Sequence, residues 1–89
     1  SRRDRSGGRD AAATLLPEDR ELYERLRAMR RRVADEKGVP PYVIFSDATL
    51  REIAMTRPTE RGQLLGVRGV GQSKLRAFGD LVLREVTGG

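Results

Sequence analysis

Two adjacent prolines, Pro40 and Pro41, divide the apolar sequence of this chain of 89 residues. Proline cannot continue a helix and disfavours helix at the residue before it, so no helix runs through "GVPPYVIF". We expect this segment to be an extended or 3₁₀ crossover that places Val43, Ile44 and Phe45 in the core. A β-strand here would need a partner, and the sequence has no second run rich in β-forming residues. The sequence therefore predicts an all-α fold.

Helical periodicity and end signals predict the elements on either side of the prolines. A first helix begins at Pro17, with acidic residues in its first turn, and ends at Gly38. A second follows Ser46 or Asp47 as N-cap and stops at Pro58. We expect a short helix around residues 59–64 and a last one from 71–73 to 86, closed by Gly88 and Gly89. The predicted inward-facing residues are Leu22, Leu26, Met29, Val33, Leu50, Ile53, Ala54, Leu75, Phe78, Val82 and Val86.

The length and composition limit the kinds of protein that this chain can be. A chain this short forms one small domain, which we assign to residues 15–89, preceded by a flexible linker or tail at residues 1–14. Cysteine and histidine are absent, which argues against zinc sites, disulfides and nucleophilic triads. No apolar run has the roughly 20 residues of a membrane span. We therefore expect no catalytic residue, metal, cofactor or membrane contact, and a cytoplasmic location.

The formal net charge of +5 points weakly toward polyanions such as nucleic acids. Residues 1–14 hold four arginines and two aspartates, which leaves +3 for residues 15–89. Asp47 with Glu52 and Asp35 with Glu36 are two carboxylate pairs, but neither is expected to be catalytic. Asp47 is better explained as a cap and Asp35 as an ion-pair partner.

The first helix carries a row of arginines that is either a basic binding strip or an ion-paired solvated face. Most of these arginines have an acidic residue four positions away, the spacing at which helical side chains meet, and this favours the solvated face. Arg27 and Arg30 are the least compensated, and we select them if this helix touches phosphate. The expected pairs are Arg20–Glu24, Glu21–Arg25, Arg31–Asp35 and Arg32–Glu36.

The stretch "VRGVG" resembles the turn of a helix-hairpin-helix motif. Such a turn points free backbone N–H groups and a helix N-terminus outward, where they can bind a phosphate, with Arg68, Lys74 and Arg76 within reach. Alternatively, Gly69 and Gly71 only permit positive φ and close packing, while the flanking valines fill the core. Both interpretations stay open from the sequence.

Tyr42 also has two interpretations. A tyrosine that follows two prolines at a crossover could stack on an unpaired base, with Lys37 close in sequence. It could equally be half-buried in the core with its hydroxyl on a nearby carbonyl, which chemistry alone slightly favours.

Taken together, "VPPYVIFSDATLREIA" and "LLGVRGVGQSKLRAFG" resemble the HRDC domain, the helicase and RNase D C-terminal module, over roughly residues 17–87. The tyrosine-bearing "PPYVIF" is similar to the branch found in RecQ-type DNA helicases. This resemblance implies a compact bundle of about five helices, without activity of its own, accessory to an ATP-dependent helicase in DNA repair and recombination. It also implies a role in DNA binding for Tyr42 and Lys37.

The resulting hypothesis is a monomeric module that weakly binds single-stranded or branched DNA. Its rival is a regulatory module that docks on the helicase core or on a partner protein, and a third interpretation is an RNA-processing module of RNase D type. The candidate DNA-binding residues are Tyr42, Lys37, Arg27, Arg30, Arg68, Gly69, Gly71, Lys74 and Arg76.

Overall fold

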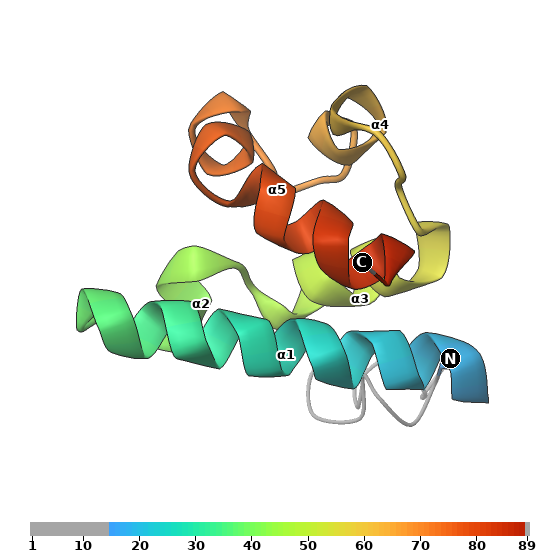
Figure 1. Cartoon of the computed structure of the whole chain (residues 1–89), viewed down its shortest axis with the longest axis horizontal. Helices are drawn as coiled ribbons and strands as arrows, with labels where there is room; N and C mark the ends of the chain where they lie inside the picture. The colour runs from blue at the N-terminus through green and yellow to red at the C-terminus, as the bar shows by residue number, and fades with distance from the viewer. Residues whose placement is uncertain (1–14, 89) are drawn as a thin grey trace, which may run out of the picture.

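A computed structural model of the chain describes residues 15–88. The predicted linker at residues 1–14 lies outside these residues and stays a prediction. The described part contains helices and no strand, which confirms the all-α prediction. The helices are α1 (Pro17–Lys37), α2 (Pro41–Ile44), α3 (Asp47–Thr56), α4 (Arg61–Leu65) and α5 (Gln72–Thr87), as Figure 1 shows.

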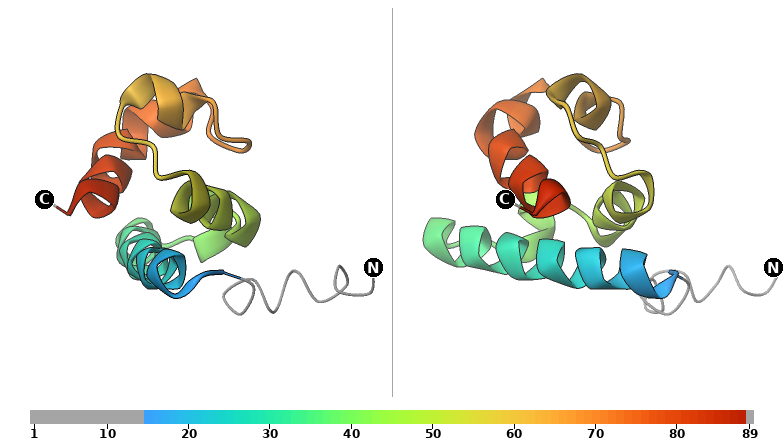
Figure 2. Two further views of the ribbon diagram at one scale, coloured as in Figure 1. Left: turned by 90° about the vertical axis from the view of Figure 1, so that its right-hand side faces the viewer. Right: turned by 45° about the vertical axis from the view of Figure 1, so that its right-hand side comes forward.

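The long helix α1 forms one layer of the molecule. The other four helices lie on one side of it, as the turned views in Figure 2 show. α1 packs against α2, α3 and α5, whereas α4 packs against α5. The opposite side of α1 therefore faces away from the rest of the domain, and α2 lies beside its C-terminal end (Figure 1).

The ends of α1 agree with the sequence signals. Pro17 occupies its first turn, where no intrahelical N–H bond is lost, and Gly38 ends it with φ of 70°. The predicted apolar stripe is buried, with Leu22, Leu26 and Met29 fully so. The buried face is wider than predicted, because it also includes Tyr23 and Arg30.

The proline segment differs from its prediction. It forms the four-residue helix α2, with Pro40 as N-cap and Pro41 in the first turn. Proline is compatible with that position, because the first N–H groups of a helix have no intrahelical partner. Val43, predicted in the core, is exposed, whereas Ile44 and Phe45 are buried as predicted. The prolines thus start a helical turn that leaves Tyr42 and Val43 outside the core.

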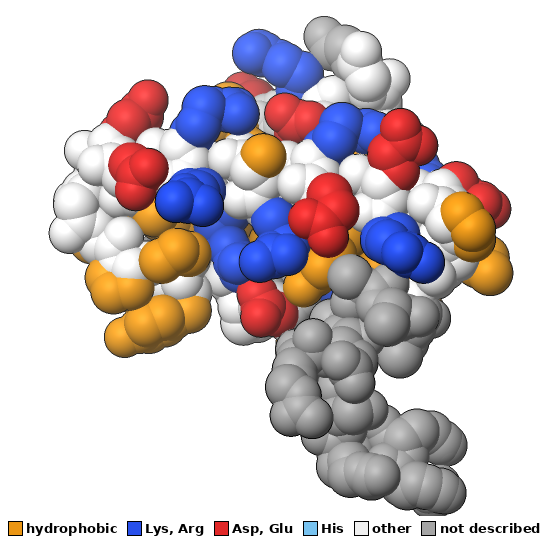
Figure 3. Space-filling view, turned by 90° about the horizontal axis from the view of Figure 1, so that it is seen from below, with side chains coloured by type: hydrophobic (Ala, Val, Ile, Leu, Met, Phe, Trp, Pro, Cys, Tyr) orange, Lys and Arg blue, Asp and Glu red, His pale blue; other side chains and the backbone are white. Residues whose placement is uncertain are grey.

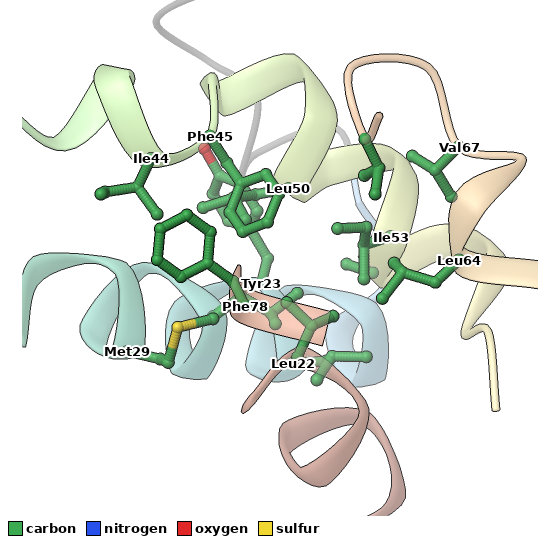
Figure 4. Packing of buried hydrophobic residues seen from close by; sticks show 14 of the residues in the cluster. Leu22, Tyr23, Met29, Ile44, Phe45, Leu50, Ile53, Leu64, Val67 and Phe78 are labelled. Carbon is green, nitrogen blue, oxygen red and sulfur yellow. The ribbon is translucent and has the colours of Figure 1, made fainter. Parts of the chain in front are cut away.

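Two aromatic rings in the core join the segment after α2 to α5. The rings of Phe45, which follows α2, and Phe78 on α5 meet edge to face with their centroids 5.8 Å apart (Figure 4). Other predicted inward residues, such as Leu50 and Ile53 of α3, pack in the same cluster, while Val86 is only partly buried. This packing fixes the position of α2 between α1 and α5.

Candidate nucleic-acid interface

Tyr42 is the most exposed large hydrophobic residue in the described part of the chain, with 70% of its surface accessible. It lies on α2 directly after Pro41, which is also exposed. The half-buried position that chemistry alone favoured for Tyr42 is therefore wrong. An accessible phenol ring held on a proline-initiated turn has the geometry needed to stack on another planar group.

Lys37 and Lys74 approach α2 from two different helices. Lys37 is exposed in the last turn of α1, with its ammonium nitrogen 5.8 Å from the ring centroid of Phe78. Lys74, on the first turn of α5, is partly buried and donates hydrogen bonds to the carbonyls of Val43 at 3.0 Å and Ile44 at 2.7 Å. The structure thus brings both predicted lysines to the end of the molecule that carries Tyr42.

Arg30 is buried and has partners on both sides of the α2–α3 junction. Its Nη1 donates to the carbonyl oxygen of Phe45 at 2.9 Å and pairs with Asp47 Oδ1 at 2.9 Å. Its Nε atom is buried without a hydrogen-bond partner. The prediction that Arg30 is poorly compensated is therefore wrong, since Asp47 neutralises it, and Ser46 rather than Asp47 caps α3.

Arg27 also has partners, contrary to the prediction. Its guanidinium pairs with Glu24 at 3.4 Å and lies over the Tyr23 ring, 5.8 Å from the centroid. Both members of the Arg27–Glu24 pair are about half exposed, and such pairs contribute at most about 1 kcal/mol. A phosphate can therefore displace Glu24 from Arg27 at little cost.

None of the four predicted ion pairs of the first helix forms within residues 15–88. Arg25 instead pairs with Glu85 of α5, at 3.7 Å. Arg20, Arg31 and Arg32 are exposed and make no ion pair with any residue of this range. The outer side of α1 is consequently more available to an anion than its sequence predicts.

A hollow on the outer side of α1 extends from Arg27 and Arg31 to the start of α2. Its volume is about 580 Å³, and Arg27 and Arg31 lie on its wall together with Pro41, the residue before Tyr42. Figure 3 looks at this face and shows several Lys and Arg side chains over the middle of α1, with Asp and Glu side chains among them and a group of hydrophobic side chains to one side. Arg31 was not selected from the sequence, although its spacing of four from Arg27 places both on one side of the helix. The remaining lining residues are Glu24, Ala28, Arg30 and Asp35.

The glycine turn between α4 and α5 has a structural role. Gly69 has φ of 93°, and a Cβ atom there would collide with the hydroxyl of Thr49. That hydroxyl donates to the carbonyl oxygen of Arg68 at 3.1 Å, which ties the turn to α3. The flanking Val67 and Val70 are buried, as the packing interpretation requires.

The other candidates around this turn lie apart from Tyr42. The Arg68 side chain lines a different hollow of about 510 Å³, against Arg51, Glu52 and Met55 of α3. Gly71 is the N-cap of α5, with open space at its Cα. Arg76 is exposed and two residues after Lys74, so about 200° of helix rotation separates them. Arg68 and Arg76 therefore do not join Lys37 and Lys74 at α2.

The pKa of the Tyr23 hydroxyl is set by burial and by the charged side chains near it. Burial raises the pKa of its hydroxyl above the usual 10.0, and the Asp47 carboxylate raises it further. The positive charges of Arg27 and Arg30 act in the opposite direction. The phenol therefore stays protonated at neutral pH.

The described residues contain no group of acidic, cysteine or histidine side chains that could hold a metal ion. No helix within 15–88 is long and apolar enough to cross a membrane. These observations define a small all-α domain with an exposed aromatic ring. Residues 19–86 match the HRDC domain, and the chain belongs to this family. The predicted family is therefore confirmed.

Several DNA helicases contain a similar stretch. The chain is 45% identical over 74 residues to the ATP-dependent DNA helicase RecQ of Bacillus subtilis, covering 83% of this chain and 12% of that protein. It is 46% identical over 61 residues to RecQ of Haemophilus influenzae, covering 68% of this chain and 10% of that protein. With the ATP-dependent DNA helicase UvrD2 of Mycobacterium tuberculosis it shares 41% identity over 70 residues, or 79% of this chain and 10% of that protein. The chain thus spans about a tenth of the length of these relatives.

A solved structure supports the same assignment. HRDC domain 3 of D. radiodurans RecQ superimposes with a TM-score of 0.76 at 31% sequence identity. The superposition covers 79% of this chain and 92% of that domain. The predicted bundle of about five helices is therefore the HRDC fold.

Proposed function

We propose that this chain is a non-catalytic accessory domain of a RecQ-like, ATP-dependent DNA helicase, and that it binds single-stranded or branched DNA weakly. In this role it helps to target or regulate the helicase during DNA repair and recombination. The observation that carries the proposal is the exposed Tyr42 ring, which directly follows Pro41 on the wall of the hollow that also holds Arg27 and Arg31. The names of the RecQ relatives support the choice of DNA as the ligand.

In this proposal, stacking binds the bases and positive charge binds the phosphates. An unpaired base stacks on Tyr42, which contributes about 1–3 kcal/mol and does not depend on the base. Lys37, Arg27 and Arg31 contact the adjoining phosphates. The described residues carry a small net charge, so we expect roughly micromolar or weaker affinity at physiological salt, as for largely electrostatic contacts.

The other predicted contacts keep different places in the proposal. Arg68, Gly69, Gly71 and Arg76 form at most a secondary phosphate contact, for a strand or branch that continues past α5. Arg30 contacts no phosphate in this proposal, because its guanidinium is already bonded to Phe45 and Asp47. It holds the segment between α2 and α3 in place.

Fluorescence anisotropy with labelled single-stranded and duplex DNA tests the proposal at low and near-physiological salt. We expect saturable, salt-sensitive binding that favours the single strand and falls roughly tenfold in Tyr42→Ala, the loss of one stacked base. Met55→Ala is the matched control, since Met55 is an exposed apolar residue in another hollow, on α3. Unchanged binding in Tyr42→Ala removes stacking from the proposal, and an equal preference for an RNA competitor favours the RNase D-type alternative.

A second candidate function is docking on the helicase core or on a partner protein with little DNA contact. The exposed apolar surface of Tyr42 and Val43 favours it, because aromatic side chains are enriched at protein interfaces. Absence of DNA binding even at low salt, together with binding to a separately produced helicase core, would establish this function instead.

A further inference from the structure

We propose that Lys74 is a positioning residue: it holds the carbonyl end of α2, fixes the direction of the Tyr42 ring and binds no DNA phosphate itself. The inference rests on the proposed function, because it concerns how the stacking residue is presented. It assigns to Lys74 a role different from the phosphate contact that its charge and place in the sequence predict.

The helix that carries Tyr42 needs support from outside. α2 has four residues, and a single turn is not stable by its own hydrogen bonds. At its N-terminal side the rings of Pro40 and Pro41 restrict the backbone. At its C-terminal side the last carbonyls have no intrahelical partner, and their partial negative charge favours a cation.

Lys74 satisfies these carbonyls from α5. Its ammonium donates to Val43 and Ile44, at 3.0 and 2.7 Å, and lies 5.5 Å from the ring centroid of Phe45. Arg30 reaches the next carbonyl, that of Phe45, from α1. Two cations from the helices on either side therefore hold three consecutive carbonyls directly after Tyr42.

The two lysines near Tyr42 differ in what their charges already contact. Lys37 is exposed, and within residues 15–88 it contacts the Phe78 ring without a hydrogen bond or ion pair. Lys74 is partly buried, and two of its three N–H donors are directed at carbonyls. A phosphate would have to break these hydrogen bonds to bind Lys74. Lys37 carries the same charge without such bonds, so its substitution is the matched control for the loss of a phosphate contact.

The first test separates positioning from phosphate contact by salt dependence. Lys74→Met should weaken binding of a labelled oligothymidylate roughly fivefold, part of the contribution of a stacked base. The slope of log Kd against log salt concentration should stay unchanged, whereas Lys37→Met should reduce it by about 0.7, the value for one phosphate of a single strand. Unchanged affinity in Lys74→Met, or a slope reduced as in Lys37→Met, would overturn the inference.

A double-mutant cycle with Tyr42 gives a second readout. Because Lys74 acts through Tyr42, Lys74→Met should change affinity less than about twofold once Tyr42→Ala is present. An equal loss in both backgrounds would contradict positioning. If Tyr42→Ala itself has no effect, the proposed stacking fails. If Tyr42→Ala weakens binding and Lys74→Met does not, only the positioning role fails.

The third test needs no DNA. In the free protein we expect Lys74→Met to lower the NMR order parameters of the amides of residues 42–45 from about 0.85 toward 0.6, while Lys37→Met leaves them unchanged. Unchanged order parameters in Lys74→Met would contradict the inference. If Lys74→Met fails to fold, the NMR signals of the lysine ammonium groups in the unmodified protein provide the test. The Lys74 signal should keep its chemical shift when oligothymidylate is added. A shift as large as that of the Lys37 signal would refute the positioning role.

Discussion

Arg30 of α1 and Asp47 of α3 form an ion pair in which one partner is buried and the other reaches solvent. The side chain of Arg30 is 9% exposed and that of Asp47 is 51% exposed, with 2.9 Å between Nη1 and Oδ1. The pair therefore links the buried side of α1 to the beginning of α3, next to the turn that presents Tyr42.

Removal of Asp47 should destabilise the domain, because it leaves the buried guanidinium of Arg30 without its counter-charge. We expect Asp47→Ala to lower the free energy of unfolding by about 1–3 kcal/mol, measured by urea denaturation. Asp80→Ala is the control, since Asp80 pairs with Arg61 at 2.8 Å where both side chains are exposed. Its cost should stay below about 1 kcal/mol, and equal costs for the two variants would contradict the structural role of Asp47.

The glycine turn gives a second stability prediction. Gly69→Ala should cost about 1–3 kcal/mol, because alanine is strained at positive φ and its Cβ meets the Thr49 hydroxyl. Gly71→Ala, two residues later, has φ of −94° and open space around the Cα, so its cost should be much smaller. Thermal unfolding of both variants measures the difference, and similar midpoints would mean that the turn tolerates a side chain.

Arg31 allows a prediction for the face of α1. Arg31→Gln should reduce the salt slope of single-strand binding by about 0.7, because one phosphate contact is lost. Arg84→Gln removes the same charge from a separate hollow formed with Arg25 and Glu85, and should leave the slope unchanged. Anisotropy titrations at several salt concentrations measure both slopes. Equal slopes for the two variants would exclude the hollow on α1 as a path for the strand.

Tyr23 predicts a loss of stability in alkaline solution. Its pKa is raised in the folded protein, so its contribution is complete below the unfolded value of 10.0 and is lost as pH rises through the folded pKa. Urea midpoints measured from about pH 8 to about pH 11 should fall more steeply in the unmodified protein than in Tyr23→Phe. Parallel curves would show that burial and Asp47 do not perturb this phenol.

The elements that the sequence predicted best are those governed by local rules. The apolar spacing of α1 and its terminal Pro17 and Gly38 define that helix without reference to the rest of the chain. The width of its buried face could not be predicted in this way, because Arg30 is buried by its contacts with Phe45 and Asp47, and Tyr23 is buried in the core cluster. Local periodicity does not contain that information, so both residues were missed as core.

Charge pairing was predicted least well, for a related reason. Helical spacing assigned Arg25 to Glu21, but the long arginine side chain reaches Glu85, sixty residues later. At Tyr42 the sequence left stacking and burial open, since local chemistry permits both. The exposure of Tyr42 follows from the packing of Ile44 and Phe45, which anchors the turn and directs its other side outward.

The contact between Phe45 and Phe78 has a consequence for how the domain opens. α2 and α3 pack on α1, and α4 packs on α5. The two rings, together with the contact of α1 with α5, therefore join two sets of helices that are each formed by neighbouring segments of the chain. Local unfolding follows such cooperative units. In native-state hydrogen exchange we therefore expect the amides of α4 and α5 to exchange together when the Phe45–Phe78 contact opens. They should exchange before the amides in the centre of α1. Tyr42 lies three residues before Phe45, so single-stranded DNA bound at Tyr42 would slow that exchange.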